Sequence, residues 1–209
     1  MKIFKFGGAS VKDAEGVKNV SLVLKSQGFA KCLLVISAMG KTTNELEKVV
    51  ELYFKKENYQ TEIKKIKQKH IEIAKGLFQE DHAVFSEINL FFDDIDSFLR
   101  RTKSPNYNFV YDQVVSCGEM ISTKIVSEYL NEIQFTNQWL DARDYIKTDD
   151  SYRDGNVNWE KTEEFISTLN SEICYVTQGF IGSDNNNFTV TLGREGSDYS
   201  AAIFAYCLN

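Results

Sequence analysis

The start of the sequence constrains the fold most, because two short apolar runs alternate there with two helical patterns. Residues 2–6 form a β-type run that ends at a double glycine, and residues 14–25 then place valine and leucine at helical spacing. A continuous apolar run in residues 31–37 is typical of a strand covered on both faces, and residues 44–54 form the second helical pattern. This β-α-β-α order predicts an α/β fold with a mainly parallel sheet and right-handed crossovers.

The rest of the sequence adds a helical region and returns to alternating elements. Apolar stripes predict two long antiparallel helices between residues 62 and 101, and a further helical stretch runs from just after Pro105 to about Leu130. The later expected elements are strands at residues 135–140 and 173–176, a helix at 159–169 between them, a hairpin around the polar turn at 184–187 and a final helix at 197–208.

Composition narrows the class of protein. With 43% hydrophobic residues in 209, the chain can bury one substantial core, so we expect one domain over residues 1–209. No stretch approaches the roughly 18 apolar residues needed to span a bilayer, and the opening residues do not form a signal peptide. We therefore expect a cytoplasmic location and no membrane partner. The net charge of −6 disfavours nucleic acid as a partner, because such binding depends on a basic surface.

The four cysteines point away from metal binding and from a disulfide framework. They lie far apart in the sequence and include no CxxC pair, so we expect buried, reduced thiols. His70 and His82 have no partner at metal-ligand spacing, and we assign them to core or surface positions. No metal-ligating residue is predicted.

The first candidate site is the double glycine, Gly7-Gly8, between a strand and a helix. Glycine lets the backbone approach an anion closely and aims amide groups at it, and Lys5 lies on the same strand within reach of a bound phosphate. Taken alone, a double glycine more often marks only a tight turn.

A second candidate lies after the next strand, where Gly40-Lys41-Thr42 is similar to the end of a P-loop. A P-loop requires glycine five positions earlier, and Val35 stands there, so a nucleoside triphosphatase is disfavoured. The hydroxyls of Ser37 and Thr43 still suit a polar ligand at the carboxyl end of the strand. Capping of the following helix is the alternative.

The segment from Gly193 to Tyr199 is the most suggestive. It places the Arg194 guanidinium, the Ser197 hydroxyl and the Asp198 carboxylate at the start of a helix. Arginine there suits bidentate recognition of a carboxylate, while simple capping of the helix explains the segment about equally well. Glu119 stands beside a glycine near the start of a predicted helix. A solvent-exposed position on the helix surface is the usual explanation for such a residue.

Taken together, these segments resemble the aspartate kinases of the amino-acid-kinase superfamily. The matching blocks are Lys5-Phe6-Gly7-Gly8-Ala9-Ser10-Val11, Val35–Ala38 with Thr43-Asn44, Ser116–Glu119, and Thr177–Gly182 leading to Thr191–Ala201. The resemblance implies a three-layer αβα sandwich with a mainly parallel central sheet. Glu195 departs from the pattern, because the family usually has glycine at that position, and it adds a negative charge.

The resemblance implies transfer of the γ-phosphoryl group of ATP to the side-chain carboxylate of L-aspartate, the first step of lysine, threonine and methionine biosynthesis. Lys5 and Asp198 would be catalytic, with Lys5 contacting the transferring group and Asp198 orienting Lys5 or the substrate. Gly7, Gly8 and Ser10 would support the phosphates. Mg²⁺ would be shared mainly between ATP oxygens and water.

The same resemblance implies the contacts to aspartate. Arg194 would hold a carboxylate and Glu119 would face the ammonium group, while Ser37 and Thr43 supply hydroxyl groups and Ser197 lies beside them. A carboxylate substrate is already a nucleophile, so phosphoryl transfer needs positioning and charge neutralisation more than a strong base.

In this family, later segments complete the sheet, bind the nucleotide base and continue into regulatory ACT domains. We therefore expect the chain to be the amino-terminal part of a longer enzyme, with little kinase activity alone and a homo-oligomeric parent protein. Two alternatives stay open, namely a related amino-acid kinase with another carboxylate substrate and a non-catalytic amino-acid-binding or assembly module.

Overall fold

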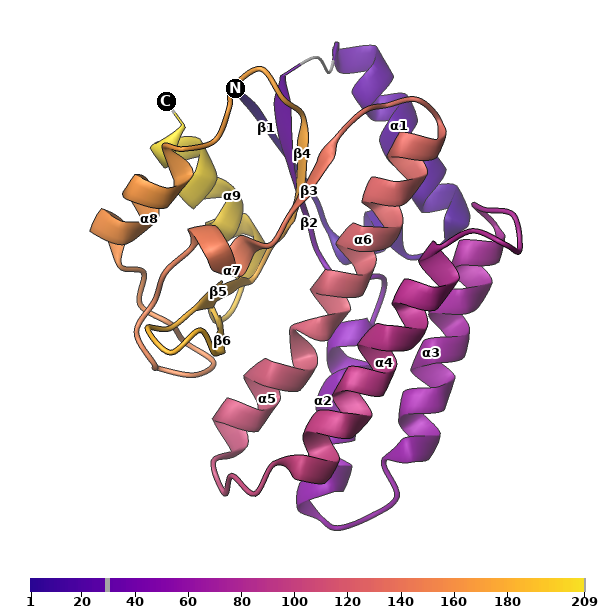
Figure 1. Ribbon diagram of the computed structural model, residues 1–209, viewed down its shortest axis with the longest axis vertical. Coiled ribbons are helices and arrows are strands. Elements are labelled where there is room, and N and C mark those ends of the chain that lie inside the picture. Colours follow the sequence, from indigo (N-terminus) through magenta and orange to yellow (C-terminus); the bar gives the residue numbers. More distant parts are fainter. Residues whose placement is uncertain (29–30, 209) are drawn as a thin grey trace.

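A four-stranded parallel sheet forms the centre of the protein (Figure 1). The computed structural model describes residues 1–28 and 31–208. The strands are β1 (Lys2–Phe6), β2 (Cys32–Ile36), β3 (Gln138–Leu140) and β4 (Tyr175–Gln178). Their order across the sheet is β1-β2-β4-β3, and all three neighbouring pairs run parallel. The strands expected at residues 135–140 and 173–176 exist, with bounds shifted by up to three residues.

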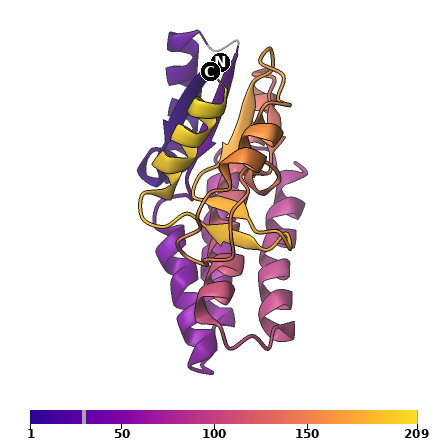
Figure 2. The same cartoon turned by 90° about the vertical axis from the view of Figure 1, so that its left-hand side faces the viewer.

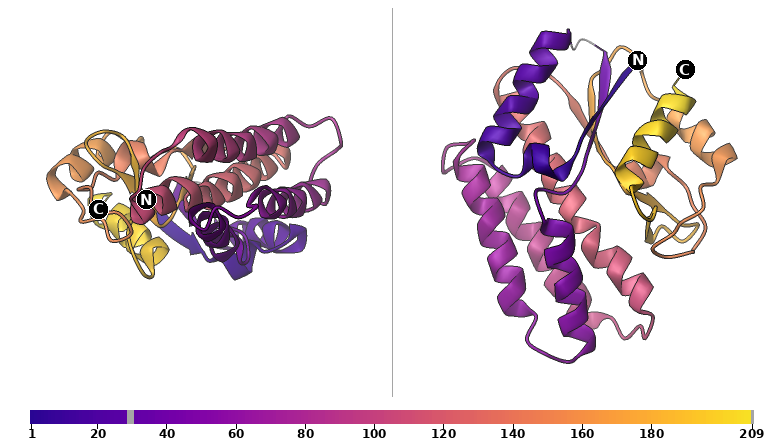
Figure 3. Two further views of the ribbon diagram at one scale, coloured as in Figure 1. Left: turned by 90° about the horizontal axis from the view of Figure 1, so that it is seen from below. Right: turned by 180° about the vertical axis from the view of Figure 1, so that it is seen from behind.

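The central strand β2 is buried on both faces, as its unbroken apolar sequence predicts. Leu34 and Ile36 belong to one apolar core, and Leu33 and Val35 to the other, because successive side chains of a strand point to opposite faces. Helices cover both faces, so the expected three-layer αβα architecture is confirmed (Figures 1 and 3).

Helices α1 (Ala14–Gln27) and α6 (Cys117–Glu132) cover one face of the sheet, and α8 (Trp159–Ile166) and α9 (Gly196–Cys207) cover the other. The sequence sets the limits of α1 locally. The Asp13 side chain accepts a hydrogen bond from the Gly16 amide at 2.8 Å, and Gly28 ends the helix at a φ of +67°. α9 carries buried Ile203 and Phe204 against the sheet.

Four helices extend the molecule beyond one end of the sheet (Figure 2). They are α2 (Thr42–Phe54), α3 (Gln60–Lys75), α4 (Val84–Arg101) and α5 (Tyr107–Val115). The two long helices predicted between residues 62 and 101 are α3 and α4, which pack against each other. The expected stretch ending near Leu130 is divided, since Ser116 separates α5 from α6.

The remaining short elements are a turn, one helix and a hairpin. They are a 3-10 turn, η1 (Gly8–Val11), helix α7 (Ala142–Tyr145), and the antiparallel hairpin of β5 (Ile181–Ser183) and β6 (Thr189–Thr191). The hairpin was predicted from its polar turn, whereas the four-residue α7 was not. None of the helices in the described part of the chain is long and apolar enough to cross a membrane.

The prediction of four buried thiols is half right. Cys32 and Cys174 are buried, but Cys117 and Cys207 are only partly buried, and no disulfide joins any of the four in the described chain. Cys207 lies in the last turn of α9, where it packs at the margin of the second apolar core. His70 is fully buried, and its Nδ1 lies 2.8 Å from the carbonyl oxygen of Ile66, which fits the predicted core position.

Candidate active site

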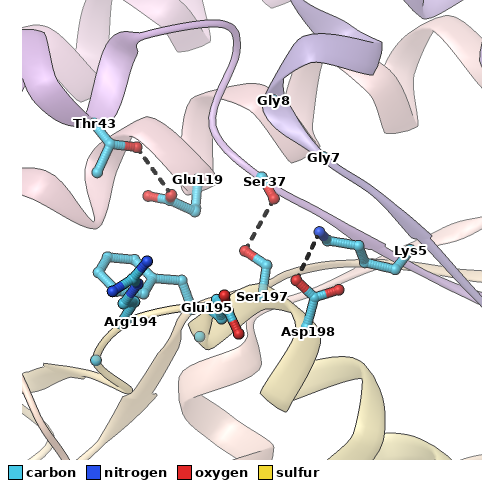
Figure 4. Close-up of a pocket in the computed structure, with 13 residues that line it drawn as sticks. Lys5, Gly7, Gly8, Ser37, Thr43, Glu119, Arg194, Glu195, Ser197 and Asp198 are labelled. Carbon is cyan, nitrogen blue, oxygen red and sulfur yellow. Dashed lines mark hydrogen bonds and ion pairs between the residues drawn. The ribbon is translucent and has the colours of Figure 1, made fainter.

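A cavity of about 340 Å³ opens where the carboxyl ends of β1, β2 and β4 meet the amino end of α9 (Figure 4). Ligands of parallel α/β sheets collect at this edge, because loops and helix amino ends converge there. Its lining residues are Lys5, Gly7, Gly8, Ser37, Thr43, Glu119, Phe180, Gly193, Arg194, Glu195, Gly196, Ser197 and Asp198.

The double glycine forms a close turn over the loop that follows β2. A Cβ atom on Gly8 would lie 2.6 Å from the Ala38 carbonyl oxygen, so only glycine fits this approach. The Gly40 amide donates to the Gly8 carbonyl at 2.9 Å, which fixes the two loops against each other. The Gly7 and Gly8 backbone therefore lines the cavity without a side chain to block it.

Two contacts join the ends of β1 and β2 to the start of α9 (Figure 4). The Lys5 ammonium lies 3.0 Å from Oδ2 of Asp198, and both side chains are partly exposed. The Ser37 hydroxyl donates to the Ser197 hydroxyl at 2.9 Å. An exposed ion pair of this kind adds little stability, so its importance lies in where it holds the ammonium.

Glu119 is the most buried charged group of the cavity, with 2% of its surface exposed. Its Oε1 accepts weak hydrogen bonds from the Ala38 amide at 3.4 Å and the Thr43 hydroxyl at 3.5 Å, but its Oε2 has no partner among the described residues. Burial raises the pKa of this carboxyl to about 8, against the smaller opposing effect of those hydrogen bonds. A buried carboxylate with an unused oxygen suits a cationic ligand group.

Arg194 and Glu195 form the rim of the cavity between β6 and α9. Within residues 1–28 and 31–208, Arg194 makes no ion pair or hydrogen bond, and it is exposed. Glu195 precedes α9 with a φ of +59°, a left-handed conformation that glycine adopts without strain. Glu195, which stands where related sequences usually have glycine, therefore places a strained backbone and a negative charge beside the unpaired guanidinium of Arg194.

The start of α9 approaches β4 closely because Gly179 has no side chain. A Cβ atom there would lie 2.6 Å from the Ser197 hydroxyl oxygen. Phe180 follows with a φ of +73°, and its amide donates to the Ser200 hydroxyl at 2.9 Å. Phe180 lines the cavity but was not predicted as a site residue. Its position directly after Gly179, the glycine that follows β4, was the available signal.

Asp112 on α5 is a second residue that the sequence analysis did not predict. It holds the strand that leads into the rim formed by Arg194 and Glu195. It is fully buried, and its carboxylate accepts hydrogen bonds from the amide and hydroxyl of Thr191 at 2.9 and 2.8 Å and from the Arg153 amide at 3.0 Å. Burial raises its pKa to about 6. Thr191 is the last residue of β6, three positions before Arg194, so Asp112 anchors the strand that leads into the rim. The signal in the sequence was a carboxylate inside an apolar helical run.

The structure brings together every predicted site residue except Ser10. That residue lies on η1, exposed and outside the cavity lining, although its amide donates to the Gly7 carbonyl at 2.9 Å. The roles assigned to the ten residues remain predictions. No group of three or more histidine, cysteine or acidic side chains within the described residues has the arrangement of a metal site.

These features define a class of protein: a parallel α/β protein whose cavity joins a glycine turn and a lysine to an unpaired arginine and a buried carboxylate. The model of the amino acid kinase family matches residues 1–209. The chain belongs to the amino acid kinase family.

Aspartokinases are among its relatives. Lysine-sensitive aspartokinase 3 of Escherichia coli (strain K12) is 30% identical over 212 residues, which cover 99% of this chain and 46% of that protein. An aspartokinase of Chlamydia pneumoniae is 30% identical over 205 residues, covering 97% of this chain and 44% of its own length. The chain thus spans a little under half the length of these relatives.

Solved structures agree with the sequence comparison. Escherichia coli aspartokinase III in complex with lysine and aspartate superposes with a TM-score of 0.89 at 28% identity, over 100% of this chain and 47% of that one. The form of that enzyme in complex with aspartate and ADP gives a TM-score of 0.88. The similarity covers the sheet, its helices and the cavity region together.

Proposed function

We propose that this chain is the amino-terminal catalytic part of an aspartate kinase. It would transfer the γ-phosphoryl group of ATP to the side-chain carboxylate of L-aspartate, giving 4-phospho-L-aspartate, the first step of lysine, threonine and methionine biosynthesis. One observation carries the proposal: the unpartnered Oε2 of Glu119 and the unpaired guanidinium of Arg194 share one cavity with Lys5.

The charges of the cavity match an amino acid with a second carboxylate. In the proposal, the substrate ammonium group pairs with Glu119, which removes the cost of burying that carboxylate alone. Arg194 holds one substrate carboxylate through paired N–H donors. The Thr43 and Ser37 hydroxyl groups line the same cavity, where they would accept hydrogen bonds from, or donate them to, the remaining polar atoms of the substrate.

The opposite side of the cavity suits the phosphates. The Gly7 and Gly8 backbone leaves room for close approach, and the Lys5 ammonium, held by Asp198, neutralises charge on the transferring phosphoryl group. Mg²⁺ enters with ATP in this scheme, since it keeps several waters and prefers phosphate oxygens with few protein ligands. Its charge would shield the β- and γ-phosphate oxygens.

The chemical step requires in-line attack and little else. A substrate carboxylate oxygen attacks the γ-phosphorus, and the bond from that phosphorus to the bridging oxygen of ADP breaks. No proton has to be removed from the nucleophile, so the proposal contains no general base. What the chain supplies is position and positive charge, which agrees with a site built from Lys5, Arg194 and backbone amides.

Isothermal titration calorimetry of the 209-residue chain tests the amino-acid half of the proposal. L-aspartate should bind, and Arg194→Ala should weaken binding by about tenfold to a hundredfold, the range for loss of a charged hydrogen-bond pair. Arg100→Ala, on the exposed side of α4, is the matched control and should leave affinity unchanged. Absence of aspartate binding would contradict the proposal, and so would an affinity of the Arg194→Ala variant equal to that of the unaltered chain.

Titration with MgATP and a substrate panel separates the alternatives. Aspartate binding without MgATP binding favours an amino-acid-binding module, and binding of both with aspartate-dependent ADP release favours the kinase. N-acetylglutamate lacks a free ammonium group and should bind worse than aspartate if Glu119 acts as proposed. We further propose a cytoplasmic location and a homo-oligomeric parent protein, the latter testable by light scattering.

A further inference from the structure

Two cysteines meet at the end of the sheet opposite the cavity. Cys32 is the first residue of β2 and Cys174 immediately precedes β4, the strand paired with β2. Their Sγ atoms lie 3.0 Å apart. Neighbouring strands are separated by about 4.8 Å, which falls within the roughly 4.4–6.8 Å between Cα atoms that a disulfide spans.

We propose that Cys32 and Cys174 form a site of oxidative modification, at which a peroxide converts the two thiols into an intrachain disulfide. The register of the sheet presents the two thiols to each other, because Leu33 pairs with Tyr175 and the cysteines directly precede that pair. An exposed ion pair between Lys31 and Glu172, at 2.6 Å, joins the same two chain segments just outside the cysteines. No rearrangement of the strands is needed to close the bond.

The two sulfur atoms are not equivalent. Either sulfur atom can donate the hydrogen bond between them, and with Cys174 as the donor this bond lowers the pKa of Cys32 below its ordinary value even though burial opposes the effect. The same hydrogen bond raises the pKa of Cys174. Cys32 is therefore the thiolate that reacts first, and Cys174 is the resolving thiol.

The reaction is balanced with a peroxide as the only oxidant. The Cys32 thiolate attacks one oxygen of hydrogen peroxide, the O–O bond breaks, and a sulfenic acid and hydroxide form. The Cys174 sulfur then attacks the Cys32 sulfur, its proton goes to the departing hydroxide, and the S–S bond forms. Two thiols and one peroxide thus give one disulfide and two waters.

Burial decides which oxidant suits the site. Cys32 is fully buried and Cys174 is 6% exposed, so a bulky disulfide reagent is excluded and the oxidant has to be as small as a peroxide. The other two cysteines act as internal references. Burial raises the pKa of Cys117 to about 12 and also raises the pKa of Cys207, so neither favours the reactive thiolate.

Peptide mapping after peroxide treatment tests the inference. The chain is exposed to hydrogen peroxide in native buffer, quenched with catalase, alkylated in denaturant and digested for mass spectrometry. The expected product is a peptide pair cross-linked through Cys32 and Cys174, lighter by two hydrogens than the separate peptides and cleaved by dithiothreitol. In urea the preference for this pair should disappear, because the sheet no longer aligns the thiols.

Variants complete the test. Cys32→Ala and Cys174→Ala should each abolish the cross-link, while Cys117→Ala and Cys207→Ala should leave its rate unchanged within twofold. Circular dichroism checks that each variant is folded. If a variant does not fold, peptide mapping of the unaltered chain still shows whether the Cys32–Cys174 cross-link forms. Alkylation of both Cys32 and Cys174 after peroxide treatment, or cross-links spread over all four cysteines, would overturn the inference.

Discussion

Lys5 holds the only ammonium group that lines the cavity in the described chain, and its position depends on one exposed carboxylate, that of Asp198. If the proposed kinase reaction is correct, Lys5→Ala in the parent enzyme should lower kcat at least about a hundredfold, the scale for loss of a preorganised transition-state donor. Steady-state kinetics with saturating aspartate and MgATP provides the measurement.

Lys2→Ala is the matched control for that variant, since Lys2 lies on the same strand but outside the cavity. Its kcat should equal that of the unaltered enzyme. Removal of the exposed pair between Lys5 and Asp198 should scarcely change stability, so a loss of activity cannot be attributed to unfolding. An unchanged kcat in the Lys5 variant would exclude this residue from the chemical step.

Glu119 gives a prediction that holds whatever the substrate. Burial raises its pKa from the ordinary 4.5 to about 8, so between these values the unfolded chain has lost a proton that the folded chain keeps. Stability should therefore fall as pH rises from about 5 to about 8, by up to about 1.4 kcal/mol per pH unit, and level off above that.

Urea denaturation at a series of pH values, on the unaltered chain and on Glu119→Gln, measures this effect. The glutamine side chain cannot ionise, so the difference in unfolding free energy between the two should change with pH in that window. Asp112 titrates in both proteins and cancels in the comparison. Parallel stability curves would show that Glu119 is ionised in the folded chain.

At the scale of elements, Asp112 ties α5 to the end of β6 and to the loop at Arg153. Asp112→Ala leaves two amides and a hydroxyl without their acceptor, and we expect a loss of about 2–4 kcal/mol in unfolding free energy. Asp150→Ala, at an exposed position of the same loop, should change stability by less than about 0.5 kcal/mol. Equal effects of the two substitutions in urea titrations would contradict the anchoring role.

How far the sequence predicted these elements depended on the distance between interacting residues. The strand, glycine turn and helix at the start of the chain, and the hairpin around Asp184, follow from neighbouring residues. Asp184 Oδ1 accepts from the Asn186 and Phe188 amides only two and four positions ahead. The four-residue α7 was missed because it is too short to produce a helical period.

The candidate site was predictable where a motif placed it, and not where distant packing did. The resemblance named nine of the lining residues, yet it gave no reason to expect Phe180 in the cavity or Ser10 outside it. The role of Asp112 could not be predicted from a local sequence pattern, because its hydrogen-bond partners lie 41 and 79 positions away in the sequence. Such contacts exist only once the sheet has brought the segments together.

For the whole molecule, β2 should be the most protected element. It is paired on both sides, and all five of its residues are buried between the two cores, whereas β3 is a three-residue edge strand. Native-state hydrogen exchange should show β2 amides opening only with global unfolding and β3 amides opening earlier. Equal protection of the two strands would contradict this ranking.

Lys5 and Asp198, whose side chains meet across the cavity, are 193 positions apart. A ribosome releases β1 early, and the carboxylate that holds its lysine is added only at residue 198, so a nascent chain has an incomplete site until the start of α9 has been synthesised. Ligand capture therefore requires synthesis to have passed the start of α9. Products that terminate within β6 retain the glycine bend but lack both the Arg194 guanidinium and the Asp198 carboxylate, so their site for the ligand is incomplete.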